Sequence, residues 1–90
     1  MINDPHQEIM QFPCEIAVKA MGRADGDFEA IVVGIVRRHV PDLGEGSVSC
    51  RTSRGGNYLA VTVRVNATSR EQMDALYREL SAHDAVTMVL

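Results

Sequence analysis

The stretch from residue 54 to residue 68, RGGNYLAVTVRVNAT, constrains the fold of this chain more than any other. After a glycine pair, Leu59, Val61, Val63 and Val65 alternate with more polar residues. This period of two is typical of a strand with one apolar face. A strand this long favours a place inside a sheet rather than at its edge. The chain must therefore supply neighbouring strands and a layer that covers the apolar face.

A second alternating stretch, residues 47–53, precedes the long strand and predicts a hairpin with it. The pair Gly55-Gly56 tolerates the positive φ of a tight two-residue turn, which sets Cys50 opposite Val61. A four-residue loop over residues 54–57 gives the same register. Both strands then place their apolar residues on one face. We therefore expect Cys50 to be a small, buried and unreactive core residue.

Two further elements precede the hairpin. Residues 14–21 alternate again and predict a first strand. Residues 27–40 carry apolar side chains at helical spacing, with Asp25 or Asp27 available as the N-cap and Pro41 as the stop. A helix between these two strands is therefore expected.

Two elements follow the hairpin. Thr68 and Glu71 have the spacing of a capping box, so a second helix is predicted over residues 69–81. Residues 86–90 predict a short last strand that ties this end of the chain into the sheet.

The order of elements is therefore β-α-β-β-α-β, which is an α+β arrangement. Right-handed crossovers place both helices on one face of a four-stranded antiparallel sheet. This is the ferredoxin-like fold, with strand order 4-1-3-2 and the first and third strands in the centre. We expect one domain over residues 12–90, preceded by a polar lead-in over residues 1–11.

Composition excludes several classes of protein. The net charge of -3 opposes a nucleic-acid partner, because phosphate binding needs a basic excess. The longest apolar run, residues 30–36, is too short to span a membrane, and the first residues lack a signal-peptide pattern. Two cysteines without a framework fit a reducing compartment. A soluble cytoplasmic domain with no nucleic-acid or membrane partner is expected.

Few residues offer chemistry. His6, His39 and His83 are not spaced as a metal pair on one element. Cys14 and Cys50 lie on strands that are not expected to be neighbours, so no disulfide is predicted. No nucleophile and base can be paired. We expect no catalytic residue, no metal and no cofactor, and hence no enzyme.

The sheet face that the helices leave open is the better candidate for function. A face of this kind must be solvated or paired with another surface. Its mixture of basic, aromatic and polar side chains suits a protein contact, and a merely solvated face is the alternative. The residues expected to form this interaction face are Lys19, Arg51, Tyr58, Thr62 and Arg64. The partner would be a second copy of the chain, forming a homodimer, or another protein.

Several short segments carry a family resemblance. They are Phe12-Pro13, Lys19-Ala20-Met21-Gly22, Arg38-His39, Gly56-Asn57-Tyr58, Asn66-Ala67-Thr68, Leu76-Tyr77-Arg78-Glu79-Leu80 and Val86-Thr87-Met88-Val89-Leu90. The chain resembles, from residue 12 to residue 90, the YbeD family of small bacterial proteins. The resemblance implies a fold like that of the ACT domains, which bind amino acids as regulatory modules. It also implies a lipoic-acid-related regulatory role, and it supplies no catalytic residue.

Two hypotheses of function follow. The first is a small, non-catalytic regulatory or adaptor domain that acts through its sheet face or edge, as a homodimer or with a protein partner. The alternative is a small-molecule sensor like the ACT domains. Its carboxylate-bearing ligand would lie near the first strand–helix turn, where free helix amides can receive it. The residues of this turn are Gly22, Arg23, Asp25 and Asp27.

Overall fold

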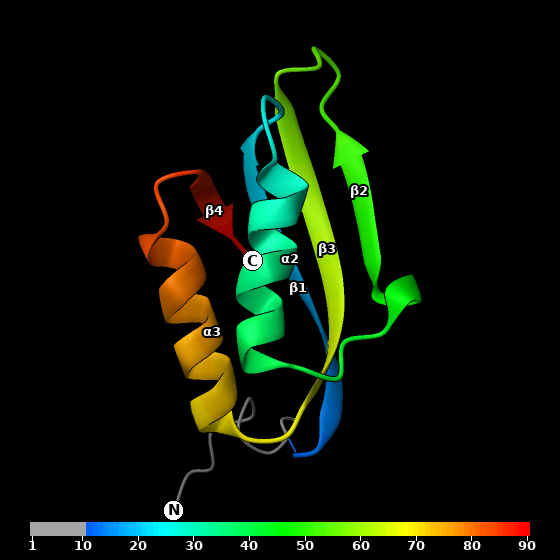
Figure 1. Ribbon diagram of the computed structural model, residues 1–90, viewed down its shortest axis with the longest axis vertical. Helices are drawn as coiled ribbons and strands as arrows, with labels where there is room; N and C mark the ends of the chain where they lie inside the picture. Colours follow the sequence, from blue (N-terminus) through cyan, green and yellow to red (C-terminus); the bar gives the residue numbers. More distant parts are fainter. Residues whose placement is uncertain (1–10) are drawn as a thin grey trace, which may run out of the picture.

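The structure, a computed structural model, describes residues 11–90. It consists of β1 (Cys14–Arg23), α2 (Phe28–His39), the short 3-10 helix η1 (Glu45–Ser47), β2 (Val48–Thr52), β3 (Tyr58–Ala67), α3 (Arg70–Ala82) and β4 (Val86–Val89). The strands form one antiparallel sheet in the order β2-β3-β1-β4, with both helices on one face (Figure 1). The predicted α+β, ferredoxin-like fold is confirmed. The expected lead-in over residues 1–11, with His6, lies outside the described residues except for Gln11.

The two central strands pair along their whole length, from Cys14 opposite Ala67 to Arg23 opposite Tyr58. β1 therefore runs two residues beyond the predicted end at Met21, because those residues still find partners on β3. β4 pairs with β1 on the other side, across an irregularity that follows Met21.

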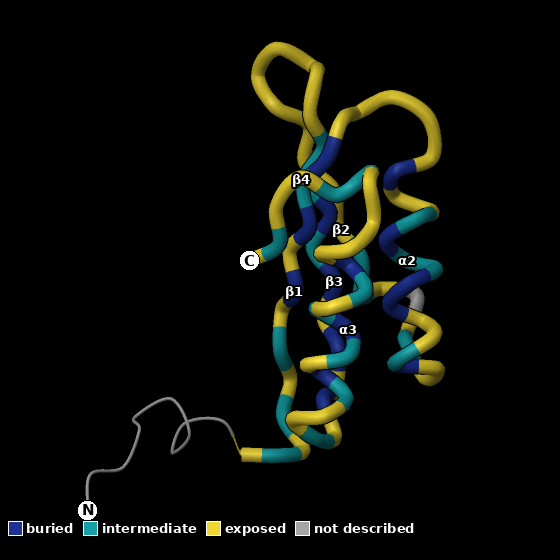
Figure 2. The backbone as a smooth tube through the Cα atoms, turned by 90° about the vertical axis from the view of Figure 1, so that its left-hand side faces the viewer, coloured by how far each residue is buried: buried dark blue, intermediate teal, exposed yellow. Residues whose placement is uncertain are grey.

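The core lies between the sheet and the two helices, and the apolar face predicted for β3 forms its floor (Figure 2). It is built almost entirely from aliphatic side chains, since Phe28 is its one buried aromatic residue among those described. Neither helix of residues 11–90 has the length and hydropathy needed to cross a bilayer. The buried residues are Val18, Ala20, Phe28, Val32, Ile35, Val36, Val40, Val61, Val63, Val65, Ala67, Met73, Leu76 and Leu80.

The start of α3 differs from the prediction by one residue. Ser69, not Thr68, is the N-cap, and its Oγ accepts a hydrogen bond from the Gln72 amide at 3.1 Å. The Gln72 side chain in turn accepts from the Thr68 amide at 2.8 Å and donates to the His39 carbonyl at 2.8 Å. Glu71 is exposed. The second contact of Gln72 joins α3 to the end of α2, which explains why the cap shifts to this pair.

The start of α2 has a weaker cap. Asp27 occupies the N-cap position, but its side chain makes no capping hydrogen bond. Asp27 O accepts from the Ile31 amide at 2.9 Å.

The hairpin has the predicted register, with Cys50 opposite Val61. It turns through the four-residue loop: Gly56 N donates to Ser53 O at 2.9 Å, and Ser53 N donates to Tyr58 O at 2.8 Å. Of the two hairpin glycines, only Gly56 has a positive φ, of 79°. Of the two connections that the sequence allows, the structure has the four-residue loop over residues 54–57 and not the tight two-residue turn.

The expected burial of Cys50 is also wrong, because its side chain is exposed. Cys50 does point to the helix side, as the register requires, but the helices lie over the other strands and leave β2 uncovered (Figure 1). The pKa of the Cys50 thiol is raised. Partial burial is the largest cause, and the hydrogen bond to the Glu29 carboxylate and the negative charge of that group add to it. Cys14 and Cys50 form no disulfide, as predicted.

Candidate functional site

The open face of the sheet displays large apolar side chains. In residues 11–90 the exposed large hydrophobic residues are Tyr58, Met88 and Leu90, at 45%, 51% and 62% exposure. Tyr58 alternates with the inward-facing residues of β3, and Met88 lies opposite Met21 on β1. Leu90 exchanges two backbone hydrogen bonds with Lys19, at 2.8 and 3.2 Å. All three exposed residues therefore lie on the face without helices.

Basic side chains gather at the β2 end of this face. A hollow of about 290 Å³ lies over β1, β2 and the hairpin, and its charged residues are Lys19, Arg51 and Arg54. Met21 and Tyr58 supply its apolar wall. No carboxylate lines this basic hollow, and no ion pair among the described side chains involves its three cations. The hollow is therefore a region of uncompensated positive charge in a chain whose net charge is -3.

The structure brings together part of the predicted interaction face. Lys19, Arg51 and Tyr58 line the basic hollow. Thr62 lies opposite Lys19 on the neighbouring strand and is half-buried. Arg64 is exposed farther along β3, opposite Ala17, and does not line the hollow.

Sequence reasoning missed three residues of this surface. The sequence places Arg54 in the hairpin loop and does not predict that it lines one hollow with Arg51. The sequence places Met88 and Leu90 on a short last strand but does not fix the register of that strand, so it does not assign their face. The pairing of β4 with β1, which the predicted strand order already contained, was the signal that could have found them.

The predicted ligand turn is built around an aromatic side chain. A Cβ on Gly22 would lie 2.4 Å from both the Ala85 carbonyl oxygen and the Phe28 ring, and Phe28 is only 3% exposed. Gly22 is thus needed for close packing of β1 against Phe28 and the chain before β4. It does not open a cradle for a ligand.

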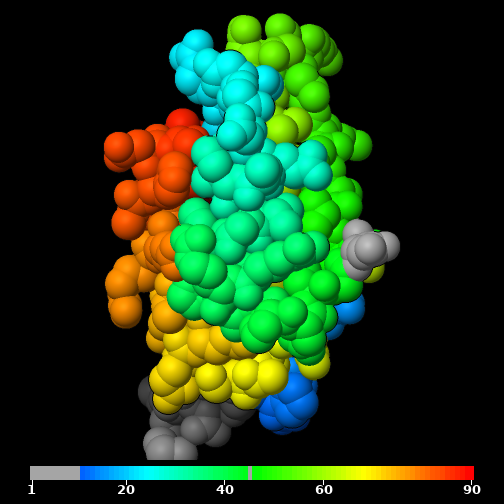
Figure 3. Space-filling model, viewed as in Figure 1, coloured from blue at the N-terminus to red at the C-terminus, as the bar shows by residue number. Residues whose placement is uncertain are grey.

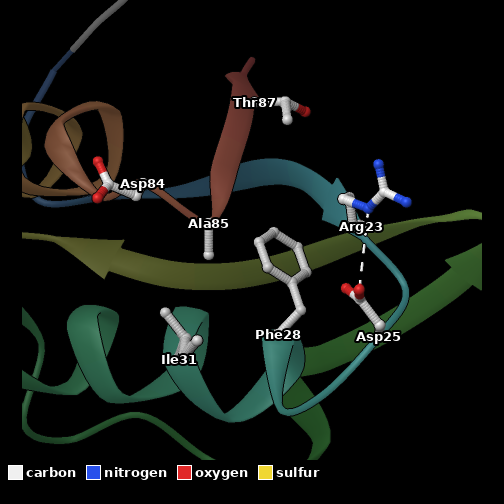
Figure 4. A pocket seen from close by; sticks show the side chains of 7 residues that line it. All are labelled: Arg23, Asp25, Phe28, Ile31, Asp84, Ala85 and Thr87. Carbon is white, nitrogen blue, oxygen red and sulfur yellow. Dashed lines mark ion pairs between the residues drawn. The ribbon is translucent and has the colours of Figure 1, made fainter.

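A small pocket of about 160 Å³ does lie beside this turn (Figure 4). Arg23 and Asp25 line it and form an exposed ion pair, with 3.8 Å between Nε and Oδ2. Asp84 lines it as well, and Asp27 lies outside it. Arg23 is the one basic residue among the side chains that line this pocket, and it already forms its ion pair with Asp25. This balance of charge opposes a carboxylate ligand.

The remaining polar groups make structural contacts. Glu79 accepts from His39 Nε2 at 2.7 Å and pairs with Arg38, which ties α3 to the end of α2. His83 Nδ1 accepts from the Ala85 amide at 3.0 Å. Within residues 11–90 no cluster of three histidine, cysteine or acidic side chains could hold a metal ion.

Comparison with known proteins supplies a family. Residues 7–90 match the family described as "Protein of unknown function (DUF493)". The chain belongs to this family. It is 44% identical over 86 residues to the UPF0250 protein RSc0326 of Ralstonia nicotianae, covering 96% of this chain and 89% of that protein. It is also 44% identical over 89 residues to a UPF0250 protein of Chromobacterium violaceum, covering 99% and 100%.

A UPF0250 protein of Nitrosomonas europaea, NE1487, is 38% identical over 84 residues, covering 93% of this chain and 97% of that protein. The resemblance to small bacterial proteins of the YbeD type is thereby confirmed. The DUF493 description and the UPF0250 names state no activity.

Proposed function

We propose that this DUF493 protein is a non-catalytic regulatory or adaptor domain that binds an acidic segment of a protein partner on its open sheet face. The observation that carries the proposal is the basic hollow, where Lys19, Arg51 and Arg54 are exposed and no carboxylate of residues 11–90 lines the surface beside them. Glutamate and aspartate side chains would neutralise these cations through charge-assisted hydrogen bonds. The adjacent Tyr58 adds the kind of aromatic surface that protein interfaces favour.

A polypeptide fits this surface better than a nucleic acid does. Single-stranded nucleic acids are held by several aromatic side chains on which successive bases stack. Tyr58 is the only aromatic side chain on the described open face. The net charge of -3 would also repel a long phosphate backbone beyond the hollow itself.

Binding of a fluorescent poly-glutamate peptide, measured by anisotropy at low salt, tests the proposal. Arg51→Glu is expected to weaken binding by about tenfold or more, because it replaces an attraction by a repulsion. The matched control is Arg78→Glu, which makes the same change of charge at an exposed residue on α3 and leaves binding close to that of the parent.

Three results would overturn the proposal. The parent fails to bind the acidic peptide, or both variants weaken binding equally, which would indicate only a net-charge effect. A single-stranded RNA oligonucleotide that displaces the peptide and binds more tightly would assign the face to nucleic acid instead.

We propose a separate surface for the predicted homodimer. Met88 lies on β4, the edge strand opposite β2, and Leu90 directly follows this strand; more than half of each is exposed. Pairing of two β4 edges would set both side chains beside those of the second copy and leave the basic hollow of each copy free. We propose that self-association uses this edge.

The two free cysteines fit a reducing compartment such as the cytoplasm.

The sensor hypothesis has weaker support than the adaptor hypothesis. Gly22 packs closely against Phe28 and Ala85 and leaves no room for a ligand. The pocket beside it is lined by two acidic residues, Asp25 and Asp84, and by one basic residue, Arg23. The three cations of the basic hollow, which pair with no described carboxylate, lie on the open face instead.

A further inference from the structure

The outer edge of β2 carries backbone groups that no other described strand pairs. β2 is the first strand in the order β2-β3-β1-β4. Because Ser53 N donates to Tyr58 O at 2.8 Å, antiparallel alternation turns the N–H and C=O of Arg51 toward β3. The same alternation turns the N–H and C=O of Cys50 and Thr52 outward. The strand VSCRT contains no proline to prevent pairing.

On the open side of the sheet, this edge borders the basic hollow. Arg51 belongs to β2 itself, and Arg54 follows in the hairpin. A side chain that extended from a strand beside β2 toward the open face would therefore enter a region of positive charge.

On the helix side, a second depression lies inward of this edge, and no residue of β2 lines it. A groove of about 450 Å³ lies between α2 and the sheet, and Ala30, Val33 and Leu59 form its apolar surface. Asp27 and Glu29 lie at the end nearest the start of α2. Figure 3 shows atoms of β3 at the surface between the first turns of α2 and β2. We call this depression the α2 groove.

We propose that the acidic partner segment binds in an extended conformation as a fifth strand beside β2, with alternate side chains in the basic hollow and the α2 groove. This inference rests on the proposed function and deepens it. Side chains of a strand point to opposite faces in turn, so one added strand directs its residues toward both depressions. The free backbone groups of Cys50 and Thr52 supply its main-chain hydrogen bonds.

The two depressions also define the pattern of the partner. Residues that enter the basic hollow are acidic, because Arg51 and Arg54 lie there without carboxylates. Residues that enter the α2 groove are small and apolar, because Asp27 and Glu29 repel further negative charge. The segment therefore alternates acidic and small apolar residues.

A second copy of this chain fits the β2 edge less well. Its own β2 would bring another Arg51 to the side that already carries Arg51 and Arg54, and it contains no acidic residue to neutralise them. Like charges across neighbouring strands are destabilising.

Two acidic peptides of identical composition test the mode of binding. One alternates glutamate and valine, and the other groups all its glutamates before all its valines. The alternating peptide is expected to bind the full chain about tenfold more tightly, because it alone fits both depressions as a strand. Ala30→Glu should reduce this preference, since Ala30 lines the α2 groove. Ala82→Glu, at an exposed residue on α3, is the matched control and should not.

Amide hydrogen exchange then locates the added strand. On binding of the alternating peptide, exchange at the Cys50 and Thr52 amides should slow, because these N–H groups become hydrogen-bonded. Exchange at Arg51, whose amide already faces β3, should change less.

The outcomes separate the two proposals. Equal affinity for the two peptides, with unchanged exchange at Cys50 and Thr52, overturns strand addition and leaves binding on the open face. No binding of either peptide overturns both proposals. If exchange at the Cys50 and Thr52 amides slows without peptide as the protein concentration rises, the edge pairs with a second copy of the chain and the inference is overturned.

Discussion

Replacing Gly22 by alanine tests the packing that underlies the turn between β1 and α2. The added methyl group would meet the Ala85 carbonyl oxygen and the Phe28 ring, each at 2.4 Å. The carbonyl belongs to the backbone that leads into β4, and the ring is 3% exposed and held in the core. Neither group can move aside cheaply, so we expect Gly22→Ala to destabilise the fold.

The size of the effect follows from two opposing terms. Overpacking of a core costs about 1–3 kcal/mol, and two obstructions at this distance place Gly22→Ala near the top of that range. Loss of glycine's freedom in the unfolded chain returns about 0.4–1 kcal/mol. The net loss in the free energy of unfolding is about 2 kcal/mol. For a domain of this size it corresponds to a fall in Tm of roughly 8–16 °C.

Thermal and urea unfolding, followed by circular dichroism, measure this loss. Gly34→Ala is the matched control, because Gly34 lies within α2 and a Cβ there meets nothing within 4 Å. Alanine in place of a helical glycine should stabilise the protein by about 0.5–1 kcal/mol. The same chemical change should therefore have opposite signs at the two positions.

A Gly22→Ala protein as stable as the parent would refute the packing argument. It would free Gly22 for the role that the sensor hypothesis gives it. A Gly34→Ala protein that was also destabilised would show that the effect is not specific to the contact with Phe28 and Ala85.

Three further predictions concern the hairpin, the thiol and the β4 edge. Gly56→Ala should cost about 1–2 kcal/mol in the free energy of unfolding because φ is 79° there, whereas Gly55→Ala should cost less; equal costs in urea unfolding would contradict this. Cys50 in the native protein should react with a thiol reagent, and the reaction rate should keep rising with pH above the ordinary thiol pKa, because the pKa of Cys50 is raised. A native protein in which Cys50 is not labelled would contradict its exposure. Met88→Glu should shift a dimer to monomer in sedimentation velocity while Ser49→Glu, on β2, does not, and the reverse result would move self-association to the β2 edge.

Much of the fold could be predicted because strand alternation and helical periodicity are local properties. The alternation from Leu59 to Val65 indicated which side of β3 would be buried, and the hairpin loop then set Cys50 opposite Val61. These features depend on residues close together in the chain, so no knowledge of distant contacts was needed. The short segments that carry the family resemblance lie in these same strands, helices and turns.

The cap of α3 shows where local pattern leaves two solutions. Thr68 with Glu71 and Ser69 with Gln72 have the same spacing, so the motif alone does not choose between them. The choice is made by Gln72, whose amide group also reaches the His39 carbonyl on α2. That contact joins residues 33 positions apart, and only the folded chain brings them together.

The candidate site depended even more on tertiary structure. The sequence by itself determined that Cys50 faces the helix side and that Lys19, Arg51 and Tyr58 face the other. Only the tertiary structure decided that α2 leaves β2 uncovered, which exposes Cys50, and that the hairpin folds Arg54 beside Lys19 and Arg51. The direction of a side chain is fixed by its own strand, whereas its cover and its charged neighbours depend on where other elements pack.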